Sequence, residues 1–247
     1  MKKLVITASS GSFSGLADEL RKISVEAIER PLISSRPPDD WARLDEALNH
    51  RNRYGSLALT SPRAAAAVAD RIRACSISWV GHTPRVWAVG AATAEALQGM
   101  LGSVQGSFPE PNGQLGAAER LAEIMLSAGA AGPVLFPCGD NRRDELPAIL
   151  RANGLVVDEV ICYRMVLASA EQARDALAGA SMVLVASPSV LQLLVEACPP
   201  SGRPALVAIG PTTAAAARSA GWQPAAVPTA PSTPALVSAI AGLLSPR

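Results

Sequence analysis

The same pair of motifs occurs twice in this sequence, and that duplication limits the possible folds more than any other feature. The first copy contains Leu59-Thr-Ser-Pro-Arg63 followed by Val86-Trp-Ala-Val-Gly-Ala-Ala-Thr-Ala-Glu-Ala-Leu97. The second contains Val185-Ala-Ser-Pro-Ser189 followed by Leu206-Val-Ala-Ile-Gly-Pro-Thr-Thr-Ala-Ala-Ala-Ala-Arg-Ser-Ala-Gly221. In each copy, one apolar strand leads through Ser-Pro into a helix, and a second leads through glycine and threonine into an alanine-rich helix. We therefore expect an internally duplicated chain.

Short apolar strands alternate with helices along the rest of the sequence, which predicts parallel sheets covered by helices on both faces. The duplication favours two open sheets over one very wide sheet. Proline-marked extended segments at about 31–38 and 162–168 predict a two-stranded connector. We therefore predict an α/β fold of two similar parallel-sheet domains, a discontinuous one formed by 1–34 plus 167–247 and an inserted one formed by 38–162. A simple cut near the middle of the chain is the alternative.

Composition excludes several classes of protein. Nearly half of the 247 residues are hydrophobic, at 49%, so the chain can bury a sizeable core. The formal net charge of +1 argues against nucleic acid or a membrane surface as a partner. The first apolar run ends at Thr7, too early for a secretory signal, and no segment approaches the length of a membrane span. We expect a cytoplasmic protein.

Cysteine and histidine usage gives no sign of a metal site. The four cysteines are far apart, without a C-x-x-C motif, and there are only two histidines. The cysteines are expected to be reduced thiols in the core. Motifs for a dinucleotide, for a P-loop or for a nucleophile elbow are also missing from the sequence.

Small, hydroxylic or glycine residues follow nearly every predicted strand and precede a helix. The carboxyl ends of parallel strands meet at one edge of a sheet, and helix N-termini carry free N–H groups with a partial positive charge. We therefore expect these residues to bind an anionic ligand. The candidates are Thr7, Ser61, Thr93, Arg142, Ser187, Ser189, Gly210, Thr212 and Thr213. The alternative is that they form ordinary helix caps and tight turns, with Arg142 simply solvated.

Tyr163 is the candidate catalytic residue. It is one of two tyrosines and lies in the second predicted connector segment. A phenol has an ordinary pKa of about 10, so it stays neutral at pH 7 and can donate a proton or a hydrogen bond. The alternative is an aromatic side chain that only packs within the connector.

Short motifs along nearly the whole chain resemble the uroporphyrinogen-III synthase family, in their order and spacing as well as their residues. They are Leu59-Thr-Ser-Pro-Arg-Ala, Val89-Gly-Ala-Ala-Thr-Ala, Arg143-Asp-Glu-Leu with Leu150-Arg-Ala-Asn-Gly154, Ile161-Cys-Tyr-Arg164, Ala186-Ser-Pro-Ser and Ile209-Gly-Pro-Thr-Thr-Ala. One departure is Thr7-Ala8-Ser9, where family members often have Thr-Arg-Pro. This departure removes an anion contact that the arginine would supply.

The resemblance implies two similar α/β domains with an active cleft between them. It implies cyclisation of the linear tetrapyrrole hydroxymethylbilane to uroporphyrinogen III, with loss of water and inversion of ring D. No metal or cofactor is implied, and the implied ligand is a polyanion. We expect a monomer by default, with the preceding enzyme of the pathway as a candidate partner. By position, Tyr163 matches the family tyrosine that assists departure of the hydroxyl, and Thr213 with Thr212 matches a threonine region of the second repeat. The alternatives are a non-catalytic ligand-binding or regulatory module on the same scaffold, or a two-domain small-molecule receptor.

Overall fold

The computed structural model describes residues 1–79, 84–97, 107–108, 116–142 and 144–244. Arg143, which belongs to one of the sequence motifs, lies outside the described residues. The chain divides into two compact units, one formed by Met1–Ser35 with Val166–Arg247 and the other by Arg36–Met165. We call them the discontinuous unit and the inserted unit. Among the described helices, none is both long and apolar enough to cross a membrane.

The discontinuous unit is built on a five-stranded sheet in the order β11-β10-β9-β1-β2, in which every neighbouring pair is parallel. Its strands are β1 (Lys2–Ile6), β2 (Val25–Glu29), β9 (Met182–Val185), β10 (Ala205–Ala208) and β11 (Pro224–Ala226). Its helices are α1 (Leu16–Lys22), α7 (Ala170–Leu177), α8 (Pro188–Ala197), α9 (Pro211–Ser219) and α10 (Thr233–Gly242).

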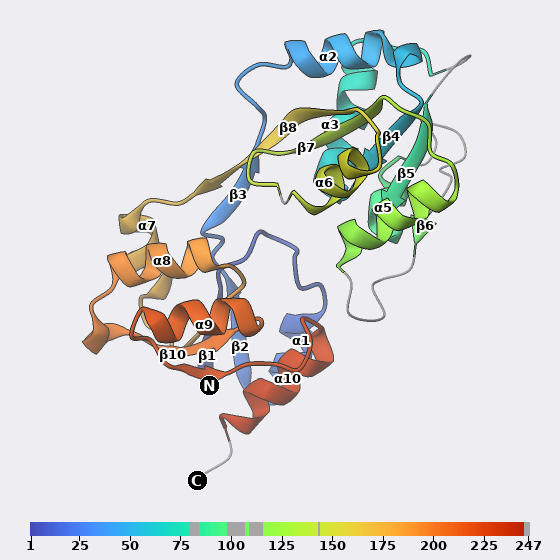
Figure 1. The fold of residues 1–247 in the computed structure, drawn as a ribbon. Helices are drawn as coiled ribbons and strands as arrows, with labels where there is room; N and C mark the ends of the chain where they lie inside the picture. The colour runs from blue at the N-terminus through green and yellow to red at the C-terminus, as the bar shows by residue number, and fades with distance from the viewer. Residues whose placement is uncertain (80–83, 98–106, 109–115, 143, 245–247) are drawn as a thin grey trace. The chain divides into compact units, whose positions relative to one another are not determined.

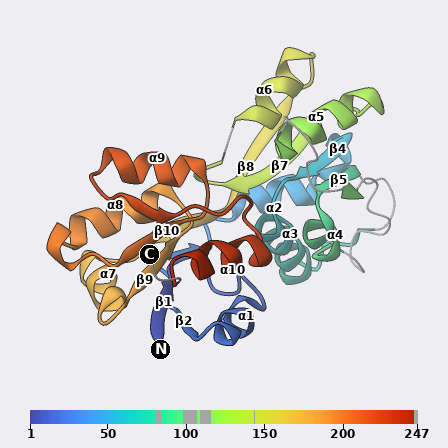
Figure 2. The same cartoon turned by 90° about the horizontal axis from the view of Figure 1, so that it is seen from below.

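Alternating side chains of these strands enter two separate core layers, as the period of a strand requires. Val5 and Val183 pack with residues of α7 and α8, whereas Leu4 and Leu184 pack with residues of α1 and α10. The ribbon views show α7, α8 and α9 on one side of this sheet and α1 with α10 on the other (Figure 1, Figure 2). A sheet buried on both faces explains why its central strands β9 and β10 contain only apolar residues.

The inserted unit has a six-stranded sheet in the order β3-β8-β7-β4-β5-β6. Its strands are β3 (Ile33–Arg36), β4 (Ser56–Leu59), β5 (Arg85–Val89), β6 (Ser107–Phe108), β7 (Val134–Gly139) and β8 (Val157–Leu167). The five strands from β8 to β6 are mutually parallel. The helices are α2 (Ala42–Asn49), α3 (Pro62–Ala74), α4 (Ala91–Glu95), α5 (Ala117–Ser127) and α6 (Glu145–Ala152).

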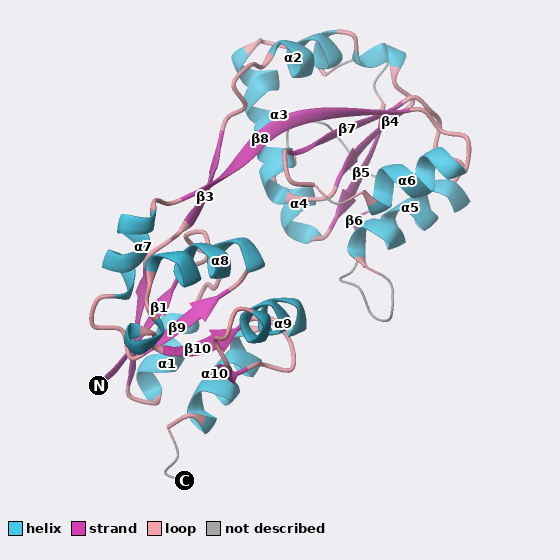
Figure 3. Ribbon diagram, turned by 60° about the vertical axis from the view of Figure 1, so that its left-hand side comes forward, coloured by secondary structure: helices cyan, strands magenta, loops and turns pink. Residues whose placement is uncertain are grey.

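This sheet is also covered on both faces. Leu57 and Leu59 of β4 pack with side chains of α2 and α3, while Ala58 between them packs with α5 and α6. Figure 3 shows the strands of this unit between those two pairs of helices. Strands β3 and β8 are hydrogen-bonded neighbours, and each crosses the boundary between the units. The predicted fold class, two parallel-sheet α/β domains with a two-stranded connector, is therefore confirmed.

The duplicated motifs match in backbone geometry at one pair of positions and differ at the other. Ser61 caps α3 with φ −147° and ψ 144°, and Ser187 caps α8 with φ −148° and ψ 149°. Each hydroxyl accepts a hydrogen bond from the backbone N–H three residues later, at 3.1 Å and 3.3 Å. In the second pair, Gly90 has φ 76° and ψ 156°, whereas Gly210 is fully extended. Only Gly90 therefore has a backbone conformation that favours glycine.

Candidate functional site

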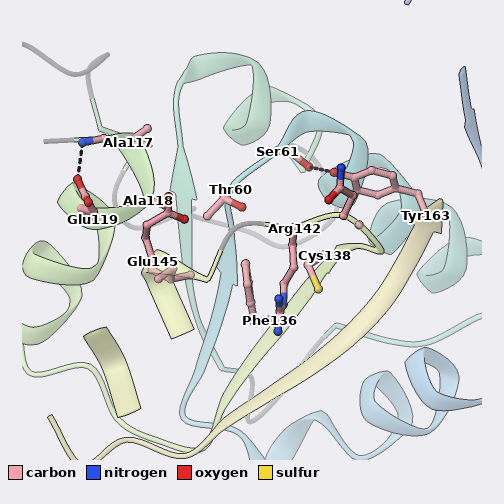
Figure 4. Close-up of a pocket in the computed structure, with 14 residues that line it drawn as sticks. Thr60, Ser61, Ala117, Ala118, Glu119, Phe136, Cys138, Arg142, Glu145 and Tyr163 are labelled. Carbon is pink, nitrogen blue, oxygen red and sulfur yellow. Dashed lines mark hydrogen bonds between the residues drawn. The ribbon is translucent and has the colours of Figure 1, made fainter. Parts of the chain in front are cut away.

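A cavity of about 490 Å³ lies in the inserted unit, at the carboxyl ends of β4 and β7. Its wall includes Thr60 and Ser61, which follow β4, Cys138 and Gly139, which end β7, and Tyr163 of β8. Figure 4 shows the pocket with its lining side chains. An open parallel sheet gathers ligands at this edge, because each strand ends here and is followed by the start of a helix. The cavity is therefore our candidate site.

Three helices begin at this cavity. Ser61 caps α3, residues 116–118 begin α5, and Glu145 is the first residue of α6; all of them line the wall. The first N–H groups of a helix have no partner within the helix, and the macrodipole adds a partial positive charge. Such ends can hold carboxylates, without a cluster of basic side chains, through those backbone N–H groups that are not already bonded; at α3, the N–H of Ala64 is bonded to Ser61 Oγ. The start of α5 and Tyr163 lie on opposite sides of the pocket in Figure 4.

Tyr163 is half-buried, with its hydroxyl oxygen 3.4 Å from Ser61 Oγ. Its orientation depends on an irregularity between β7 and β8. Cys138 is paired with Ile161, but the next residue, Gly139, is paired with Tyr163, so Cys162 is an extra residue in β8. A bulge of this kind redirects the side chain that follows it, and such bulges are frequent next to active sites.

Asp140 fixes the backbone of β8 at this tyrosine and two residues after it. Its N–H donates to the carbonyl oxygen of Tyr163 at 3.2 Å, and its carboxylate accepts from the N–H of Met165 at 3.1 Å. The loop that leaves β7 is thus tied to β8 beyond the bulge. These bonds hold the backbone in the position from which the phenol reaches the cavity.

Arg142 lines the cavity, as a predicted anion contact should, but its guanidinium already has carboxylate partners. Its Nε donates to Glu159, and Asp144 lies 3.7 Å from its Nη2. The hydrogen bond with Glu159 raises the pKa of Arg142, so its charge is permanent. Burial by itself would raise the pKa of Glu159, but hydrogen bonds from Arg142 and Arg151 outweigh burial and hold that pKa below its ordinary value. Arg142 can contact a ligand only while shared with Glu159.

The other polar groups of the cavity do not add positive charge. Glu119 accepts a hydrogen bond from the N–H of Gly116 at 2.6 Å, which caps α5. One carboxylate oxygen of Glu145 is buried and accepts no hydrogen bond from the described residues. Burial raises the pKa of the Cys138 thiol to about 11, so it is neutral at pH 7. Across the described residues, no group of three or more histidine, cysteine or acidic side chains could hold a metal ion.

The ten predicted site residues fall into three groups by their location in the structure. Ser61, Arg142 and Tyr163 line the cavity. Thr93 belongs to the same unit but is buried in α4 and does not line that cavity. The remaining six belong to the discontinuous unit, and they are Thr7, Ser187, Ser189, Gly210, Thr212 and Thr213.

These six residues lie at the carboxyl edge of the five-stranded sheet of the discontinuous unit. Strands β10, β9 and β1 are neighbours, so the ends occupied by Gly210, Ser187 and Thr7 adjoin one another. Thr7 is buried, and its hydroxyl donates to the carbonyl oxygen of Leu184 at 2.8 Å. Thr213 is also buried, whereas Ser189 and Thr212 are exposed in the first turns of α8 and α9. The exposed edge therefore consists mainly of helix starts and glycine backbone.

Sequence reasoning missed the wall formed by the start of α5. Residues Gly116, Ala117 and Ala118 carry no chemical signal in their side chains, because what they contribute is backbone N–H groups. Glu145 is not among the predicted site residues; it is the first residue of α6 and also lines the cavity. The spacing between Gly116 and Glu119 is a helix-start signal that could have indicated this wall.

The comparison with known protein families decides the family. The family model described as "Uroporphyrinogen-III synthase HemD" matches residues 14–238. This chain belongs to the uroporphyrinogen-III synthase family. The resemblance inferred from short motifs is thereby confirmed.

Individual relatives agree with the family assignment. The uroporphyrinogen-III synthase of Synechococcus elongatus is 31% identical over 163 residues, which are 66% of this chain and 60% of that protein. The chloroplastic uroporphyrinogen-III synthase of Oryza sativa subsp. japonica is 29% identical over 248 residues, 96% of this chain and 79% of the rice protein.

Two solved structures of uroporphyrinogen III synthases share the fold. A mutant of the Thermus thermophilus protein has a TM-score of 0.61 at 16% identity, covering 99% of this chain and 98% of that one. The Helicobacter pylori protein also has a TM-score of 0.61, at 15% identity, covering 98% of this chain and all of the other, at 100%. At such identities, these structures support the two-domain α/β fold of the family rather than the role of any residue.

Proposed function

We propose that this chain is a uroporphyrinogen-III synthase, which cyclises hydroxymethylbilane to uroporphyrinogen III with inversion of ring D and loss of water. Membership of the family and the names of both relatives support the reaction. The observation that carries the assignment of the site is the Tyr163 hydroxyl at a cavity walled by three helix starts. That arrangement combines a proton donor with N–H groups suited to carboxylates.

The first chemical step is departure of the substrate hydroxyl. The Tyr163 O–H gives its proton to that oxygen, the carbon–oxygen bond breaks with its electron pair on oxygen, and water leaves. The remaining azafulvene cation is attacked by ring D through its substituted α-carbon, which forms a spiro intermediate. The intermediate opens and closes again in the inverted sense. The proton lost when the last pyrrole regains aromaticity returns to the Tyr163 oxygen.

Most of the work of such an enzyme is orientation rather than acid catalysis. The unguided reaction closes the ring without inversion, so the protein has to hold the flexible substrate in the one geometry that allows attack by the substituted carbon. We propose that the substrate carboxylates are bound by the helix starts at the cavity and at the carboxyl edge of the discontinuous unit. Ser61, Ser187 and Gly210 with Thr212 stand at those starts.

The proposal also covers the ligand class, the oligomeric state, a partner and the cellular location. The ligand is a small molecule of the tetrapyrrole class, and we propose a monomer with the preceding enzyme of the pathway as a candidate partner. A cytoplasmic location is part of the proposal, and the four cysteines are free thiols, as a reducing compartment requires. The rice relative is described as chloroplastic.

The decisive experiment supplies freshly prepared hydroxymethylbilane to the purified protein and separates the product isomers. The proposal expects the inverted isomer, formed faster than spontaneous cyclisation. A non-catalytic binding module on the same scaffold would bind the tetrapyrrole and leave only the non-inverted isomer at the spontaneous rate. That result would contradict the proposal that this chain is a uroporphyrinogen-III synthase.

Tyr163→Phe tests the proton donor. Loss of the phenolic O–H should lower kcat by about 10²–10⁴-fold, the usual contribution of general acid catalysis. Tyr54→Phe is the matched control, because Tyr54 is the only other tyrosine and its hydroxyl bonds to Asp158 at 2.5 Å, away from the cavity wall. Turnover of Tyr163→Phe close to that of the control would remove Tyr163 from this role.

A further inference from the structure

Gly139, the last residue of β7, lies directly against the ring of Tyr163. A Cβ atom built on Gly139 would be 2.6 Å from Cε2 and Cζ of that ring and 2.9 Å from its hydroxyl oxygen. Carbon atoms in contact are normally separated by about 3.5–4.0 Å. Any side chain at position 139 would therefore occupy space that the phenol ring now fills.

The backbone conformation of Gly139 does not require glycine. Seven other glycines have positive φ angles in the described residues, and Gly139 is not among them. Its neighbours in the sheet are regular apart from the shifted register that pairs it with Tyr163. The constraint at this position is thus the space taken by the ring, and only a residue without a side chain meets it.

The ring cannot respond without moving its hydroxyl. Tyr163 also packs against the core cluster that contains Cys162 and Val160, and Asp140 ties its backbone to the loop after β7. To open the contact from 2.6 Å to an ordinary separation, the ring would have to move by roughly 1 Å. The hydroxyl, now 3.4 Å from Ser61 Oγ at the cavity, would move with it.

We propose that Gly139 is a positioning residue, which lets the Tyr163 ring lie across the end of β7 and thereby sets the location of its hydroxyl in the cavity. Its catalytic consequence rests on the proposed function. The slot formed by Gly139 and the bulge at Cys162 makes the orientation of the proton donor a property of the β7–β8 pair. A displacement of about 1 Å at a reacting group can lower the rate about 10²-fold.

The test compares Gly139→Ala with Gly202→Ala. A Cβ at Gly202 would have nothing within 4 Å, and that residue also lacks a positive φ angle, so the control makes the same chemical change in open space. Both proteins are labelled with 3-fluorotyrosine. With only two tyrosines in the chain, the ¹⁹F spectrum has two resonances, which Tyr54→Phe assigns. Gly139→Ala should shift the Tyr163 resonance and leave that of Tyr54, whereas Gly202→Ala should shift neither.

Kinetics provide the second measurement. Gly139→Ala should lower kcat by about 10²-fold with little change in KM, and it should add almost no further loss in the Tyr163→Phe background, because its effect passes through the hydroxyl. The proposal would be overturned if Gly139→Ala left the Tyr163 resonance unshifted. It would also be overturned if Gly139→Ala lowered kcat by the same factor in the wild-type and the Tyr163→Phe proteins. If the wild-type chain forms no inverted isomer, the proposed function fails, whereas the resonance still decides whether Gly139 positions the ring.

A third variant keeps the test decisive if Gly139→Ala does not fold. Removing the ring removes the atoms that a new Cβ would meet, so Gly139→Ala combined with Tyr163→Ala should be as stable as Tyr163→Ala alone. A double variant that stays unfolded while Tyr163→Ala folds would show that position 139 clashes with something other than the ring. That outcome would also overturn the proposal.

Discussion

The duplicated caps allow one stability prediction to be made twice in the same molecule. Ser61 and Ser187 have nearly identical backbone angles, stand before proline at the start of α3 and α8, and accept one backbone hydrogen bond each. Replacing a serine cap with alanine leaves that N–H without its partner. The usual cost is about 1 kcal/mol, within a range of roughly 0.5–2 kcal/mol. Ser61→Ala and Ser187→Ala should therefore lower the free energy of unfolding by similar amounts.

The expected shift can be measured by calorimetry or circular dichroism. For units of this size, about 1 kcal/mol corresponds to a decrease in Tm of roughly 3–5 °C. Ser61→Gly is the matched variant, because glycine at a cap costs only a few tenths of a kcal/mol relative to serine. If Ser61→Gly costs as much as Ser61→Ala, or if either alanine variant melts with the wild type, the argument that these hydroxyls act as helix caps is refuted.

Three further outcomes follow from local geometry. Gly90→Ala should lower the free energy of unfolding by about 1–3 kcal/mol, because φ is 76° there, whereas Gly210→Ala, in an extended and open position, should cost far less in the same urea titration; equal costs would contradict this. Glu159→Gln should weaken the loss of stability as the pH falls below about 4.3, because the flanking arginines depress the pKa of this glutamate and stabilise only its ionised form; an unchanged acid limb in pH-dependent melting would contradict this. Burial raises the pKa of Cys138 to about 11 and that of Cys162 to about 12, so mass spectrometry should find both alkylated by iodoacetamide at pH 8 far more slowly in the native protein than in urea.

The fold could be predicted because its evidence is local and repeated. The Ser-Pro step predicts the start of α8 at Pro188, where the structure has it, and Pro211 begins α9 as its missing N–H suggests. The extended segments around 31–38 and 162–168 correspond to β3 and the end of β8. Local patterns are enough to predict these elements, because the signals are apolar runs and the Ser-Pro and Gly-Pro steps that follow them.

The candidate site could be predicted only in part, because its remaining features depend on contacts between distant segments. The hydroxyl residues after the strands correctly indicate the carboxyl edge of each sheet. They do not reveal the direction of each side chain, since Thr7 and Thr93 are buried. The extra residue at Cys162, which turns Tyr163 toward the cavity, depends on the pairing of two strands. No pattern in either strand alone reveals such a shift.

The interrupted path of the chain has a consequence for synthesis on the ribosome. All residues of the inserted unit have been made once Met165 is in place, so its sheet can form while translation continues. Strand β1 lies between β2 and β9, and it gains its second neighbour only after Met182–Val185 emerges. One edge of this apolar strand therefore stays unpaired while the whole inserted unit is made, and an unpaired strand edge is a template for pairing with another chain.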